Sequence, residues 1–207
     1  MKAELFEEDN KVNQAIKSYI ECDAISSDDT QKQSIIHHRL GRLYESESAW
    51  EESILHLEKS SRLCQDNNDG SLGTVLFSLS SVYLKSKRYE DALRCNKQLV
   101  SHQSDSISLA DVFHSMGQIY NKLSQYDDAI EYLNKSLSIN RALGDPNQKD
   151  IAKILLDLAT VHENLNDLTA ASDSLVEVRK FVLSFIDLSP RFFTDMINVH
   201  RHYVLFD

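Results

Sequence analysis

Histidines are the side chains in this sequence best suited to acid–base or metal chemistry, but their spacing does not assemble a site. His200 and His202 are two residues apart on a predicted helix, so their side chains point in different directions and do not share a metal ion. His37 and His38 are adjacent, which predicts one inward and one outward side chain rather than a catalytic pair. His162 stands at a position held elsewhere by aromatic residues and is interpreted as a packing residue.

No established catalytic motif is present. The sequence contains no glycine-rich phosphate loop, no nucleophile elbow and no zinc-protease helix motif. We therefore expect no catalytic residues, no metal site and no cofactor, in a protein that is not an enzyme. Cys22, Cys64 and Cys95 are odd in number and far apart, which indicates reduced and mostly buried thiols of an intracellular protein. We expect a cytoplasmic location.

Composition narrows the remaining classes of partner. The formal net charge of −10 argues against nonspecific nucleic-acid binding, which requires a basic surface. No run approaches the roughly 18 apolar residues that span a bilayer. With 42% hydrophobic residues, five glycines and two prolines, the chain is expected to be globular and all-helical.

The elements that position any site are internal repeats. Aromatic residues, or His162 in their place, recur with a period near forty, and each is followed nine residues later by a small residue. The leading residues are Phe6, Tyr44, Tyr83, Tyr120 and His162, and the small residues are Ala15, Ser53, Ala92, Ala129 and Ala171. Apolar residues within each copy fall three or four positions apart, as a helix face requires.

Small residues and capping signals place two helices in each copy. Small residues stand where two helices must approach closely. On the first helices they are Gly41, Ser80, Gly117 and Ala159, and on the second helices they are Ser53, Ala92, Ala129 and Ala171. The pairs Ser48 with Glu51 and Ser124 with Asp127 have capping-box spacing and predict that a second helix opens at each serine.

Together these residues resemble a known family. Met116, Gly117 and Tyr120, followed by Tyr126 and Ala129, match the pattern of the tetratricopeptide repeat (TPR), and the resemblance extends from Phe6 to about Arg179. It implies an α-solenoid of stacked antiparallel hairpins in a right-handed superhelix. Two features depart from the family: the period exceeds the usual 34 or so residues, and the closing proline is absent. The long-repeat subgroup of kinesin light chains is similar to this chain in Leu143, Gly144 and Asp145, followed by Ala152, Leu155, Leu158 and Ala159.

The repeat spacing also predicts a division of the chain. The expected parts of one solenoid are a partial repeat at 1–26, full repeats at 27–66, 67–104, 105–144 and 145–186, and a single C-terminal helix at 187–207. That last helix is too apolar for a good cap, so it is predicted either to dock on further chain or to mediate self-association through Phe192, Phe193 and Met196.

The resemblance implies that a peptide lies along the first helices. The candidate groove residues are His38, Arg39, Arg42, Phe77, Ser81, Lys85, His114, Gln118, Asn121 and Lys122. Along the first helices of three copies, Glu45 is outnumbered by four basic residues: Arg39, Arg42, Lys85 and Lys122. An acidic or phosphorylated segment is therefore the expected ligand. The alternative is that they are solvated helix residues in internal ion pairs. The family's chaperone-tail binders use a lysine and asparagine clamp, whereas His38 and Arg42 stand there in this chain.

Two classes of function remain. The favoured one is a protein–protein interaction scaffold, or adaptor, that binds a linear and possibly acidic peptide in its concave groove. The alternative is a structural solenoid segment of a multi-subunit complex, assembled through its edge and its apolar C-terminal helix. Salt-sensitive binding of a short peptide distinguishes the first from the second, which requires a large apolar interface.

Overall fold

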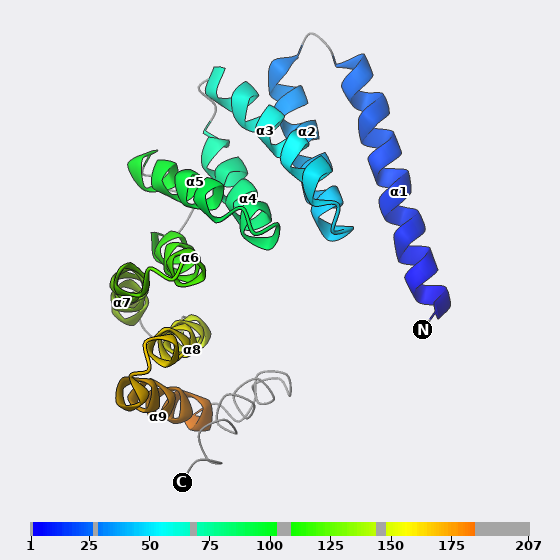
Figure 1. The fold of residues 1–207 in the computed structure, drawn as a ribbon. Coiled ribbons are helices and arrows are strands. Elements are labelled where there is room, and N and C mark those ends of the chain that lie inside the picture. The colour runs from blue at the N-terminus through cyan, green and yellow to red at the C-terminus, as the bar shows by residue number, and fades with distance from the viewer. Residues whose placement is uncertain (1, 27–28, 67–69, 103–108, 144–147, 185–207) are drawn as a thin grey trace. The chain divides into compact units, whose positions relative to one another are not determined.

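The computed structural model describes residues 2–26, 29–66, 70–102, 109–143 and 148–184. These residues form helices with no strand among them, which confirms the predicted all-α fold class (Figure 1). The helices are α1 (Lys2–Ile25), α2 (Thr30–Ser46), α3 (Trp50–Asp66), α4 (Leu72–Lys85), α5 (Tyr89–His102), α6 (Leu109–Lys122), α7 (Tyr126–Leu143), α8 (Gln148–Asn164) and α9 (Leu168–Ser184). The predicted self-association residues Phe192, Phe193 and Met196 lie outside the described residues.

The helices group into two compact units, one ending at Ser108 and the other beginning at Leu109. In the first unit α2 pairs with α3 and α4 with α5, α3 packs against α4, and α1 packs mainly on α2. In the second unit α6 pairs with α7, α8 with α9, and α7 packs against α8. Each unit is therefore a stack of antiparallel hairpins. The division into repeats given above remains a prediction.

Close approach of the two helices in a hairpin occurs at the predicted small residues. Gly41 and Gly117 are buried, and a Cβ atom built on either would lie 2.5 Å from the Cγ atom of a leucine on the paired helix, Leu57 or Leu133. Ser53 on α3 is fully buried and donates a hydrogen bond to the Gly41 carbonyl at 2.7 Å. Glycine at these two positions is thus a packing requirement.

The turn within each hairpin has one repeated geometry, and it corrects the capping-box prediction. Helices α3 and α7 begin at Trp50 and Tyr126, two residues after the serines expected to cap them. Ser48 and Ser124 instead have φ near 59°, in the left-handed region, as Lys87 and Asn166 have at 62° and 60° in the other two hairpins.

A bond pattern of the Schellman type ends the first helix at each of these turns. After Ser48, the Ala49 amide donates to the Tyr44 carbonyl at 2.9 Å, and the Ser48 amide donates to the Glu45 carbonyl at 3.1 Å. The same two bonds occur in the other three hairpins. The chain therefore reverses in three residues, and the left-handed residue is what allows it to do so.

Replacing a left-handed residue with glycine should stabilise the fold. For Lys87→Gly we expect a gain of about 0.5–1 kcal/mol, because relief of the left-handed backbone cost exceeds the extra chain entropy of glycine in the unfolded state. Ser86→Gly is the matched control: Ser86 has φ −81°, so glycine there should be neutral or destabilising. Denaturant unfolding followed by circular dichroism measures both, and equal effects of the two substitutions would contradict the strain argument.

Adding one methyl group at the close approach should destabilise the second unit. In Gly117→Ala the new Cβ meets Leu133, whose side chain is fully buried, so an overpacking cost of about 1–3 kcal/mol should outweigh alanine's helix preference of up to ~1 kcal/mol. In a Leu133→Ala background the same change should be neutral or stabilising. A double-mutant cycle with no coupling between the two positions would show that contact with Leu133 is not the cause.

Candidate functional site

In the first unit, most predicted groove residues on α2 and α4 are bonded to one another or to neighbours. His38 Nε2 lies 3.0 Å from Ser78 Oγ, and Glu45 Oε1 accepts a hydrogen bond from Lys85 Nζ at 2.7 Å. The same oxygen accepts a bond from Ser81 at 3.2 Å, while Glu45 Oε2 lies 3.6 Å from Arg42 Nε. The Glu45 carboxylate thus pairs with two of the basic groove residues, Arg42 and Lys85.

In the second unit, α6 and α8 are joined in the same manner. His114 Nε2 lies 2.6 Å from Asp157 Oδ2, and the Gln118 side-chain amide donates to the same oxygen at 2.8 Å. The Asn164 amide donates to Asn121 Oδ1 at 2.9 Å. These polar groups hold two first helices side by side.

The two sets of contacts share one register. In each unit the residue six positions before one aromatic position, His38 or His114, contacts the residue five before the next, Ser78 or Asp157. The residue one after an aromatic position likewise contacts the residue two after the next one, which gives Glu45 with Lys85 and Asn121 with Asn164. We call this set of contacts the first-helix ladder.

Three predicted groove residues make none of the polar contacts described above. Arg39 and Lys122 are exposed and make no hydrogen bond or ion pair with any residue that the structure describes. Phe77 on α4 is 37% exposed. Phe77 and Arg39 belong to the first unit and Lys122 to the second.

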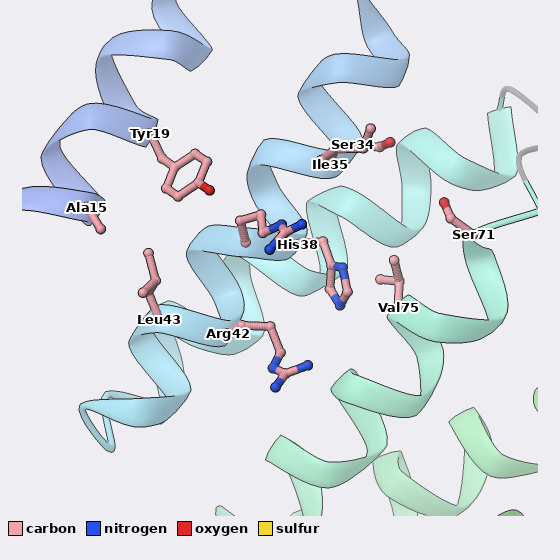
Figure 2. A pocket seen from close by; sticks show the side chains of 10 residues that line it. Ala15, Tyr19, Ser34, Ile35, His38, Arg42, Leu43, Ser71 and Val75 are labelled. Atoms are coloured by element: carbon pink, nitrogen blue, oxygen red, sulfur yellow. The ribbon is translucent and has the colours of Figure 1, made fainter. Parts of the chain in front are cut away.

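A pocket of about 590 Å³ lies between α1, α2 and the first turns of α4. Figure 2 shows Tyr19 reaching from α1 toward α2, and His38 directed toward Val75 on α4. The lining residues are Ala15, Tyr19, Ser34, Ile35, His38, Arg39, Arg42, Leu43, Ser71 and Val75. Three predicted residues, His38, Arg39 and Arg42, are therefore brought together here.

The pocket is apolar on its walls and cationic at α2. It is lined by two arginines and no carboxylate, in a chain whose formal net charge is −10. Burial, followed by the charges of Arg42 and Arg39, lowers the pKa of His38. The imidazole is therefore neutral at pH 7, and the positive charge in the pocket comes from the two guanidinium groups.

Sequence reasoning missed the walls that α1 and α4 contribute. Ala15 and Tyr19 line the pocket from α1, Ile35 from α2 and Val75 from α4, and none of the four is among the predicted groove residues. The Ile35 side chain is 50% exposed beside Arg39. Ile35 stands two positions before His37, and its apolar type was a visible signal in the sequence, but only the placement of α1 makes it part of a pocket.

The described residues give no support to other kinds of site. Among them no cluster of three or more histidine, cysteine or acidic side chains is arranged to hold a metal ion. None of the described helices has the length and apolarity needed to cross a bilayer. Cys22, Cys64 and Cys95 are free thiols, the latter two buried as expected.

Solved structures with the same fold are similar along nearly the whole chain. A protein of Podosopora anserina described as a kinesin light chain with nearly identical TPR-like repeats has 16% identity and a TM-score of 0.74, over 90% of this chain and 93% of its own. BtubC (BKLC) from P. vanneervenii has 17% identity and a TM-score of 0.72, over 91% and 80%. MamA from Desulfovibrio magneticus RS-1 has 17% identity and a TM-score of 0.68, over 88% and 96%.

Sequence comparison identifies the family. A comparison with curated proteins finds no significant match. Family profiles described as tetratricopeptide repeat match residues 36–71 and 108–181, which together make up more than half of the chain. The predicted resemblance and the predicted helical-hairpin fold are thus confirmed, and the fold is that of kinesin light chain-like repeats. The chain belongs to the tetratricopeptide repeat family.

Proposed function

We propose that the protein is a non-enzymatic interaction scaffold that binds an extended, acidic peptide segment of a partner protein. The observation that carries this proposal is the pocket between α1, α2 and α4, where Arg39 and Arg42 face an apolar cavity without a lining carboxylate. Membership of the family supports a scaffold, and the arginines of the pocket support an acidic ligand. Buried free thiols at Cys64 and Cys95 support a reducing compartment, and we place the protein in the cytoplasm.

Arg39 is the strongest anchor for an anionic group. It has no carboxylate partner in the described chain, so a ligand carboxylate would not have to displace an internal one. Arg42 lies one turn further along α2, where its Nε is 3.6 Å from Glu45, a distance longer than a good charge-assisted hydrogen bond. A guanidinium group can hold a carboxylate through two parallel hydrogen bonds, which adds geometric selectivity.

The apolar walls define the rest of the ligand. Ile35 is half exposed, and Val75 and Leu43 line the same cavity. An acidic residue with a large apolar neighbour in sequence would place its carboxylate at α2 and its apolar side chain between α1 and α4. Phe77 offers a second apolar contact further along α4, at the edge of the first-helix ladder.

Charge sets the expected strength and salt dependence. The net charge of −10 repels an acidic peptide at long range, so attraction depends on short-range contact with the two arginines. Partly exposed charged contacts contribute about 0.2–1 kcal/mol each, and more where they are bidentate and desolvated. Binding should therefore be modest in affinity and should weaken as salt is added.

Charge reversal at the pocket should abolish the preference for acidic peptides. The assay uses an array of short acidic–aromatic peptides, together with copies in which amides replace the carboxylates. We expect the double variant Arg39→Glu/Arg42→Glu to bind the acidic peptides at least about tenfold more weakly than the wild type does. The control is Lys97→Glu/Lys180→Glu, which makes the same change in net charge at exposed positions on α5 and α9. It should bind like the wild type.

Two results would count against the proposal. If both double variants lose binding equally, net charge rather than the pocket is responsible. If the wild type does not distinguish carboxylates from amides, and associates only through salt-insensitive contacts, a structural role in a larger complex is the better account.

Arg39→Glu should leave the free energy of unfolding within about 0.5 kcal/mol of the wild type, because Arg39 is exposed and unpaired in the described chain.

A further inference from the structure

The pocket between α1, α2 and α4 holds more positive charge than its one neighbouring carboxylate neutralises. Arg39 and Arg42 line the pocket from α2, and Lys85 on α4 joins them through Glu45. Lys85 Nζ lies 2.7 Å from Glu45 Oε1, whereas Arg42 Nε is 3.6 Å from Oε2, so the lysine is the closer partner of that carboxylate. Three cations beside one carboxylate leave a surplus of two positive charges among the described residues.

The histidine in the pocket adds nothing to this surplus. Burial lowers the pKa of His38, and the charges of Arg42 and Arg39 lower it further. The imidazole is therefore neutral at pH 7, and its Nε2 lies 3.0 Å from Ser78 Oγ on α4. Since Lys85 is paired with Glu45, the uncompensated charge lies on the two guanidinium groups of α2.

The two guanidinium groups can reach the same anion. Arg39 and Arg42 are three positions apart on one helix, which puts them on one face with their Cβ atoms about 5–6 Å apart. Arg39 makes no hydrogen bond or ion pair with any residue that the structure describes. Arg42 approaches a carboxylate only through Nε, and its side chain is 62% exposed. Both can therefore turn their terminal amino groups toward a ligand.

Helix α1 supplies a donor without charge on the opposite wall. Tyr19 lines the pocket, and its hydroxyl group is directed toward α2 (Figure 2). This hydroxyl makes no hydrogen bond within the part of the chain that the structure describes. The pocket thus combines two charged forks of N–H donors with one O–H donor, a set that suits an anion with more than two acceptor oxygens.

A phosphate group matches this set better than a carboxylate does. A phosphorylated side chain carries a charge of about −1.5 to −2 at pH 7 on three terminal oxygens, whereas a carboxylate carries one charge on two oxygens. One phosphate can therefore neutralise both arginines. The net charge of −10 repels a dianion more strongly at long range, but salt screens that repulsion beyond about 8–10 Å and leaves the direct contacts in place.

We propose that the pocket binds a phosphorylated serine or threonine of a partner protein, with the phosphate held between Arg39 and Arg42. This inference rests on the proposed function, since it gives the anion at the same site a more specific identity. The short phosphorylated side chain leaves a neighbouring apolar residue close enough to contact Ile35 and Val75 in the same pocket of about 590 Å³. Phosphorylation of the partner would then control its attachment to the scaffold.

Four forms of each array peptide test this proposal, with serine, glutamine, glutamate or phosphoserine at the acidic position. Fluorescence anisotropy measures their affinity for the full chain at pH 7 in a buffer without phosphate. We expect the phosphoserine form to bind on the order of tenfold more tightly than the glutamate form, because it engages the second arginine. Equal affinities of these two forms would overturn the proposal.

Removal of one arginine should reduce the preference for phosphate. Arg42→Gln should weaken binding of both anionic forms, but that of the phosphoserine form more, so that the ratio of their affinities falls below about threefold. Lys97→Gln is the matched control, because it removes one positive charge from an exposed position on α5. The control should keep the wild-type ratio. An equal fall in both variants would assign the preference to net charge and contradict the proposed site.

Free phosphate is the other source of the same anion, and competition distinguishes it from a phosphorylated segment. An excess of inorganic phosphate, with chloride adjusted to hold the ionic strength constant, should displace the phosphoserine peptide only weakly, because it makes no contact with the apolar walls. Competition as strong as that of unlabelled phosphoserine peptide would show that the pocket binds a free anion, and the proposal would fail.

The four peptide forms also separate this inference from the proposed function. If glutamate forms bind better than glutamine forms and phosphoserine adds nothing, the proposed function stands and the phosphate inference fails. If the phosphoserine form alone binds better than the glutamine form, the phosphate inference stands and the carboxylate ligand of the proposed function fails. If neither anionic form binds better than glutamine, both fail.

Discussion

Close contact between the two helices of a hairpin is the constraint on which the other features depend. At Gly41 and Gly117 there is no room for a side chain, because a leucine of the paired helix fills the space. Ser80 and Ala159 hold the corresponding places in the other two hairpins, both fully buried or nearly so. This contact fixes the spacing of the helices, and the left-handed turn residue then reverses the chain in three residues. Within each unit, the two first helices of neighbouring hairpins are thereby set side by side.

The first-helix ladder follows from that placement, and it limits what the surface can bind. Polar side chains such as His38, His114 and Asn121 face a neighbouring helix at hydrogen-bonding distance, so they stabilise the stack and have less capacity left for a ligand. Arg39 lies outside the ladder and donates no hydrogen bond to any residue that the structure describes. Whether a residue at a ligand-facing position is available to bind a ligand therefore depends on whether the next repeat supplies it with a hydrogen-bonding partner.

The sequence was sufficient to predict the repeats and the small residues, because both depend on periodicity along one chain. It was insufficient for the turns, since Ser48 and Ser124 fit a capping box equally well, and only the backbone shows that they end one helix instead of starting the next. It also overcounted free cations, because Arg42 and Lys85 share Glu45. Pairing across helices was the missing information. The register that relates His38 to Ser78, counted from the aromatic positions, recurs in the second unit between His114 and Asp157 and can be read in the sequence.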